Sequence, residues 1–127
     1  MIIKQEKFSF GRGYRYVYTI DSIAIRKDAI RFSLNAFTKL PFEEKVMRIE
    51  DGLTSYEGTL SENFRSIDDF DVFIVKYLSS PIYLIMILGR YKGHRVQVSI
   101  HLDKSIVVIT GQNVSSIKEI EDILDMK

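Results

Sequence analysis

The fold is decided by residues 82–110, which read IYLIMILGRYKGHRVQVSIHLDKSIVVIT. Three apolar stretches are separated here by two short polar turns, Lys92-Gly93 and Asp103-Lys104. Two-residue turns that contain Gly or Asp are typical of antiparallel hairpins, and β-branched residues are enriched in strands. We therefore predict an antiparallel meander of three strands over 82–91, 95–102 and 105–110.

The middle strand of this meander alternates between apolar and polar residues, so one of its faces should point to the core. Its apolar residues are Val96, Val98, Ile100 and Leu102. The first strand does not alternate, because Leu84, Met86 and Leu88 on one side are backed by Tyr83, Ile85 and Ile87 on the other. A strand that is apolar on both sides should be covered on both sides, by a helix or by a second subunit.

Two coverings of this strand are compatible with the sequence. A second copy of the chain would make Tyr83, Ile85 and Ile87 a homodimer interface, since an exposed apolar patch usually marks an interaction site. Alternatively, the amino-terminal strands pack there as a second layer.

An amino-terminal hairpin is predicted from Phe8–Phe10 and Tyr14–Ile20, which flank Gly11-Arg12-Gly13. Two further strands are predicted over Ser22–Arg26 and Ile30–Ala36, since apolar and polar residues alternate in the second of them. The competing prediction for this region is a helix from Asp28, because Ile30, Leu34 and Phe37 also fall near helical spacing.

Residues 41–50 are predicted as a short helix behind Pro41, a residue favoured at the first helical position. The alternative is a strand hairpin about Asp51-Gly52, a strong two-residue turn signal.

Two helices flank the meander. The first follows Ser66 as N-cap, ends near Ser80, and carries an apolar stripe of Ile67, Phe70, Phe73, Ile74, Tyr77 and Leu78. The second is capped by Ser115 or Ser116, with Glu119 at capping-box spacing from Ser116 and an apolar side of Ile117, Ile120, Ile123 and Leu124. We expect one α+β domain over residues 1–127, an antiparallel sheet with two or three helices packed on it.

Composition narrows the class of protein. The chain has 127 residues, no cysteine and a formal net charge of +1. The absence of cysteine suits a reducing cytoplasm, and charges at Lys4, Glu6 and Lys7 interrupt what a secretory signal would need as an apolar stretch. The longest apolar run, Ile82–Leu88, is far shorter than the ~20 residues of a membrane helix, so we expect a cytoplasmic protein without a membrane span.

No catalytic, metal-binding or cofactor-binding pattern is visible in the sequence. There is no nucleophile elbow and no phosphate-binding glycine loop before a helix. His94 and His101 are separated by an odd number of residues, which directs them to opposite faces of a regular strand. We expect no enzyme activity and no cofactor.

The Arg/Tyr-rich amino-terminal hairpin and the basic turn over Arg90–Arg95 are candidates for partner binding. Aromatic rings beside arginine can stack on bases and hold phosphates, although tyrosines in a strand also commonly cover the edge of a core. The residues concerned are Arg12, Tyr14, Arg15, Tyr16, Tyr18, Lys92 and Arg95.

Two functions follow as expectations. The first is a small non-enzymatic protein-protein interaction module, such as an accessory, regulatory or immunity-type factor, whose partner is another protein or a second copy of the chain. The alternative is a nucleic-acid-binding protein that uses the amino-terminal hairpin; a net charge close to neutral places it second.

Overall fold

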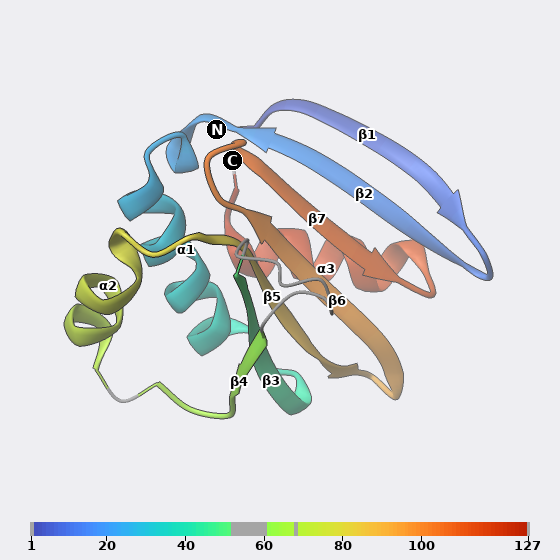
Figure 1. Ribbon diagram of the computed structural model, residues 1–127. Helices are drawn as coiled ribbons and strands as arrows, with labels where there is room; N and C mark the ends of the chain where they lie inside the picture. Colours follow the sequence, from blue (N-terminus) through green and yellow to red (C-terminus); the bar gives the residue numbers. More distant parts are fainter. Residues whose placement is uncertain (1, 52–60, 68, 127) are drawn as a thin grey trace, which may run out of the picture.

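The computed structural model of the chain describes residues 2–51, 61–67 and 69–126. Within these residues a seven-stranded antiparallel sheet has the order β1-β2-β7-β6-β5-β3-β4, and α1 and α3 lie behind it in Figure 1. The predicted α+β fold is thereby confirmed. The strands are β1 (Ile2–Phe10), β2 (Gly13–Ile20), β3 (Glu43–Asp51), β4 (Ser61–Phe64), β5 (Ile82–Tyr91), β6 (His94–His101) and β7 (Ile106–Gly111). The helices are α1 (Arg26–Lys39), α2 (Phe70–Leu78) and α3 (Val114–Leu124), and a 3-10 turn covers Asp21–Ile23.

The carboxy-terminal meander and the amino-terminal hairpin form as the sequence predicts. β5 and β6 are joined through Lys92 and Gly93, which both have positive φ values, 52° and 84°. This backbone matches the twist of the two strands it connects and suits glycine at its second position. The hairpin of β1 and β2 is longer than predicted, since β1 already begins at Ile2.

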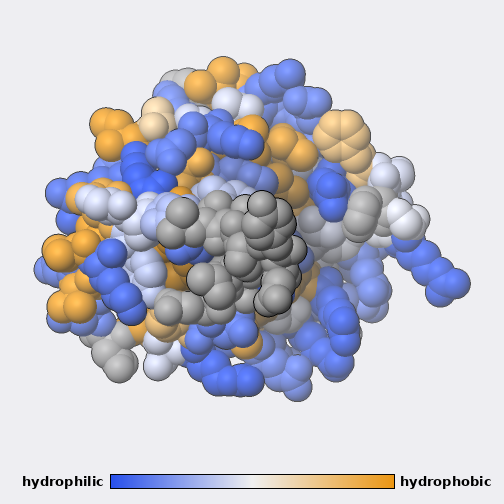
Figure 2. Space-filling model, in the orientation of Figure 1, coloured by the Kyte–Doolittle hydropathy of each residue, from blue (hydrophilic) through white to orange (hydrophobic). Residues whose placement is uncertain are grey.

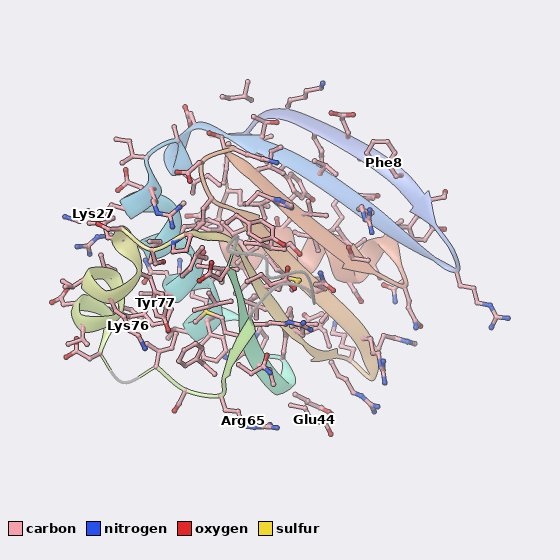
Figure 3. All side chains as sticks on the ribbon, in the orientation of Figure 1. Phe8, Lys27, Glu44, Arg65, Lys76 and Tyr77 are labelled. Atoms are coloured by element: carbon pink, nitrogen blue, oxygen red, sulfur yellow. The ribbon has the colours of Figure 1, made fainter. Side chains whose placement is uncertain are left out.

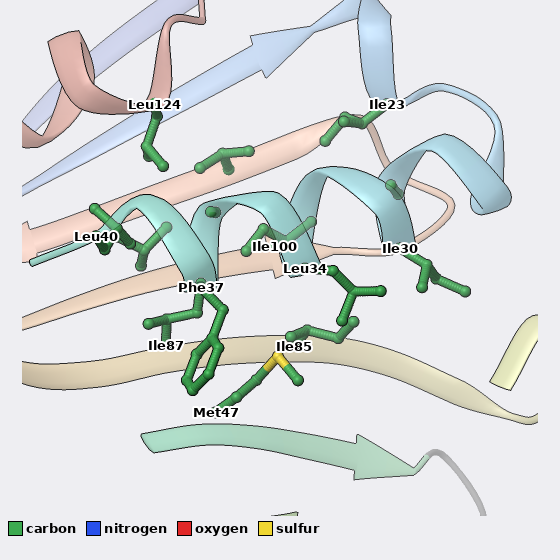
Figure 4. Close-up of a cluster of buried hydrophobic side chains, with 14 of the residues drawn as sticks. Ile23, Ile30, Leu34, Phe37, Leu40, Met47, Ile85, Ile87, Ile100 and Leu124 are labelled. Carbon is green, nitrogen blue, oxygen red and sulfur yellow. The ribbon is translucent and has the colours of Figure 1, made fainter. Parts of the chain in front are cut away.

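The core lies between α1 and the sheet. Ile87 and Ile100 are fully buried, and Figure 4 shows them in the cluster that also contains Leu34 and Phe37 of α1. The register places Ile87 beside Val98 and Ile100 beside Ile85, so the inward residues of β5 and β6 form one continuous layer.

Two of the three residues predicted to form a homodimer interface belong to this core. Ile85 and Ile87 are fully buried inside the chain, so the interface prediction is wrong for both. Tyr83 is half-exposed, and its hydroxyl donates a hydrogen bond to Glu50 Oε2 at 2.9 Å. The physical reason is that β5 is apolar on both sides, and alternation cannot tell which side the helices cover.

The segment predicted as strands over Ser22–Arg26 and Ile30–Ala36 is instead the 3-10 turn and α1. The competing helix prediction is therefore the correct one. Burial decides between the two periods: Ser33 is buried and donates a hydrogen bond to the carbonyl of Ala29 at 2.8 Å, whereas strand alternation would have exposed it. Buried residues of α1 recur at helical spacing: Ala29, Ile30, Ser33, Leu34, Ala36 and Phe37.

The short helix predicted over residues 41–50 is wrong, because this segment is strand β3. β3 pairs antiparallel with β5 on one side and with β4 on the other, so the segment is a strand, as in the alternative prediction. The predicted turn at Asp51-Gly52 includes Gly52, which belongs to residues 52–60 and lies outside the described residues.

Lys45 of β3 secures the end of α1. Its ammonium donates hydrogen bonds to the carbonyls of Phe37 and Leu40, at 2.9 Å for Leu40. These are carbonyls that a helix end leaves without partners, and a cation is favoured at the negative end of the helix dipole. Burial lowers the pKa of the Lys45 side chain.

Arg26, at the start of α1, connects three distant parts of the chain. Its guanidinium donates hydrogen bonds to the carbonyls of Leu78 (2.9 Å), Ser80 (2.5 Å) and Ile82 (2.8 Å), and to Asp103 Oδ2 (2.8 Å). Arg26 thereby holds the link between α2 and β5 and the turn between β6 and β7 against α1.

The other two helices exist as predicted, but both predicted N-caps are wrong. Asp69, not Ser66, caps α2 by accepting a hydrogen bond from the backbone nitrogen of Val72. Asn113, rather than Ser115 or Ser116, caps α3 by accepting one from the backbone nitrogen of Ser116. Asp and Asn are as favourable as Ser at this position, so composition could not choose between neighbouring candidates.

Candidate interaction surfaces

The predicted tyrosine platform faces the core. Tyr14, Tyr16 and Tyr18 share one side of β2, but Tyr16 is 4% exposed and Tyr18 is fully buried. The Tyr18 hydroxyl donates to Glu121 Oε2 of α3 at 2.8 Å, and burial together with this carboxylate raises the Tyr18 pKa. The base-stacking prediction is therefore wrong for Tyr16 and Tyr18, which pack the hairpin onto α3.

The predicted basic residues do not form one surface. Arg12 lies in the exposed turn between β1 and β2, and Arg15 lies on the other side of the sheet from Tyr14 and Tyr16. Lys92 forms an ion pair with Glu119 of α3 at 2.8 Å, which neutralises part of the basic turn. Arg95 is exposed and stands directly across from Arg90 on β5.

The sheet face opposite α1 carries a hollow of about 300 Å³. Its polar groups bond to one another: Gln97 Nε2 donates to Ser99 Oγ at 2.9 Å and contacts Met86 Sδ at 3.3 Å. The residues that line the hollow are half-buried or buried: Arg15, Val17, Leu84, Met86, Gln97, Ser99, His101, Val108 and Thr110. The hollow is shallow and has both polar and apolar walls. Among the described residues that line it, no nucleophile is hydrogen-bonded to a base.

His101, at one end of this hollow, makes folding sensitive to pH. Burial, with a smaller contribution from Lys104, lowers the pKa of His101 below its ordinary value of about 6.5. As the pH falls below about 6.5, the unfolded chain takes up this proton before the folded chain does, and stability is lost. We expect the free energy of unfolding of His101→Gln to fall less steeply than that of wild type between about pH 6.5 and pH 5.

Urea unfolding across this pH range measures the difference. His94→Gln, which alters an exposed histidine at the other end of β6, is the matched control. Superimposable stability-pH curves for wild type and His101→Gln would refute the assignment.

α2 is apolar on two sides. Its inward side, Phe73, Ile74 and Tyr77, is buried, and Phe73 and Tyr77 stack edge-on against Phe64 of β4. On its outward side Val72 is 62% exposed and Val75 is 78% exposed.

We define the outward side of α2 as Asp71, Val72, Val75 and Lys76, which together line a shallow apolar depression. Hydrophobic atoms gather at the left edge of the molecule in Figure 2, where Figure 1 places α2. Figure 3 labels Lys76 of the outward side and the buried Tyr77 beside this helix. Leu78 is also half-exposed, and Ile25, next to the Arg26 that binds the Leu78 carbonyl, is 66% exposed.

The sequence prediction missed this surface, although a signal was present. Apart from Asp71 and Lys76, every residue of α2 is apolar or aromatic, whereas a helix with one buried side usually has a polar opposite side. An apolar helix that remains exposed is a mark of an interaction site.

Comparisons with protein-family models, with curated proteins and with solved structures gave no match. Among the described helices, none combines the length and the apolar character that a membrane crossing requires.

Proposed function

We propose that this chain is a non-enzymatic interaction module that binds another protein through the outward side of α2. The observation that carries the proposal is the pair of exposed valines, Val72 and Val75, one helical turn apart. Removing such side chains from water is the main favourable term in protein association, at about 25 cal/mol per Å² of apolar area.

The flanking groups support the same proposal. Asp71 and Lys76 border the two valines with charges of opposite sign, which is the apolar centre and polar rim found in protein interfaces. By contrast, the nucleic-acid alternative loses two of its three stacking rings to the core, and Lys92 of its basic turn is paired with Glu119.

Val75→Glu is expected to abolish binding while leaving the fold intact. Because Val75 is 78% exposed, a charge there meets water in the free protein, and the free energy of unfolding should change by less than about 0.5 kcal/mol. In a bound complex the same carboxylate would be buried without a partner, which is costly. The measurement is affinity capture from native lysate with tagged wild type and tagged variant, after nuclease treatment.

Ile3→Glu is the matched control, since Ile3 on β1 is 65% exposed and receives the same change on a different surface. Proteins retained by wild type and by Ile3→Glu but lost by Val75→Glu would support the proposal. Retention of the same proteins by all three would contradict it, and so would capture of nucleic acid alone before nuclease treatment.

A further inference from the structure

We propose that the outward side of α2 pairs with the same side of a second copy of the chain, about a two-fold axis parallel to the helix. This inference rests on the proposed function, because it names the partner of the same surface. The juxtaposition that carries it is a valine stripe with an acid on one flank and a base on the other.

Helix geometry fixes these flanks. Successive residues turn by about 100°, so Val72 and Val75 lie on one stripe, and Asp71 and Lys76 lie on opposite sides of it. The buried residues Phe73, Ile74 and Tyr77 occupy the reverse side of the helix. In heptad terms Val72 and Val75 take the a and d positions, and Asp71 and Lys76 take the flanking g and e positions.

The two flanking charges are available to a partner. In the described part of the chain neither Asp71 nor Lys76 forms an ion pair, although the Lys76 ammonium lies 5.0 Å from the centroid of the Tyr77 ring. Both side chains are on an exposed part of α2.

A parallel pair satisfies these charges twice. A two-fold axis along the helices brings the Asp71 flank of one copy to the Lys76 flank of the other, at the five-residue offset that joins g and e positions in parallel coiled coils. An antiparallel pair would instead place the Asp71 flank against the Asp71 flank of the other copy, and the Lys76 flank against its Lys76 flank, so that the acid and the base do not meet. Charge complementarity therefore favours a second copy in the parallel arrangement.

The pair should be weak on its own. α2 has nine residues, and each copy contributes only Val72 and Val75 to the apolar contact. The area that they bury is far less than the interface area of a stable dimer. We expect a dissociation constant on the order of 100 µM, from a contact at the low end of interface sizes.

Charge reversal tests the arrangement. Asp71→Lys places two lysines opposite each other at both flanks, and Lys76→Asp places two aspartates there, so each variant alone should self-associate about tenfold more weakly. In an equimolar mixture of the two variants, both flanks again join a lysine to an aspartate. The mixture should therefore recover the association that each variant has lost.

Sedimentation equilibrium measures the self-association of the wild type, of each variant and of the mixture, at protein concentrations up to about ten times the expected dissociation constant. Recovery in the mixture supports the inference, and Val75→Glu should be monomeric throughout while Ile3→Glu dimerises as wild type does. A wild-type chain that stays monomeric overturns the inference, as does a dimer that Val75→Glu leaves unchanged or variants that behave as wild type. A monomeric chain that still loses captured proteins on Val75→Glu would leave the proposed function standing with a different partner.

Discussion

Ile87→Ala is expected to lower the free energy of unfolding by about 3 kcal/mol. Ile87 is fully buried beneath α1 and lies beside Met47 of β3 and Val98 of β6. Truncating a buried isoleucine loses its transfer free energy and leaves a cavity that close-packed neighbours fill only in part. Urea denaturation followed by circular dichroism measures the loss.

Leu88→Ala is the control, because Leu88 is the next residue on β5 and points to the opposite, half-buried side of the sheet. It should cost about 1 kcal/mol, since less apolar area leaves water there. A Leu88→Ala variant as unstable as Ile87→Ala, or less stable, would contradict the side of the sheet on which the core is placed.

Arg26→Ala should be nearly as damaging, with an expected loss of about 3 kcal/mol in the free energy of unfolding. The variant removes hydrogen bonds to the carbonyls of Leu78, Ser80 and Ile82 and the ion pair with Asp103. Hydrogen bonds from a charged donor contribute more than neutral ones, and the partly buried carbonyls would be left unsatisfied.

Arg26→Lys should recover only a small part of this loss, because an ammonium cannot reproduce the planar fork that reaches several acceptors at once. Arg31→Ala, at an exposed position of the same helix, should change stability by less than about 0.5 kcal/mol. If Arg26→Ala unfolds at the same urea concentration as Arg31→Ala, the connecting role of Arg26 is refuted.

The meander could be predicted because each of its strands carries its own signals. The turn at Lys92-Gly93 and the alternation around Val98 are local, and both are present in the structure. α1 was ambiguous because Ile30 and Leu34 fit both a strand and a helix; the two periods differ at Ser33, whose burial is a tertiary fact. For β3 the helix prediction is wrong and the strand alternative is right, because the conformation of this segment depends on pairing with β5, whose partner residues are 31 to 47 positions away in the chain.

The interaction surfaces were harder to predict than the fold. Alternation placed Tyr14, Tyr16 and Tyr18 on one side of a strand correctly, but only the position of α3 makes that side the inner one. Of the apolar stripe predicted for α2, Phe73, Ile74 and Tyr77 are buried, but Phe70 and Leu78 are exposed, and the prediction does not include the second apolar side of the helix. Which residues of α2 face outward depends on its contacts with Phe64 of β4 and with α1, and α1 is distant from α2 in the chain.

A cross-link at Val72 tests whether α2 pairs with the α2 of a second copy. The chain contains no cysteine, so Val72→Cys introduces a single thiol on the outward side of α2. In a parallel pair about a two-fold axis, position 72 of one copy faces position 72 of the other, close enough for a disulfide. Mild oxidation of the purified variant should therefore give a covalent dimer that Ile3→Cys does not form. Equal yields from the two variants, or no covalent dimer from Val72→Cys, would contradict the pairing of α2 with itself.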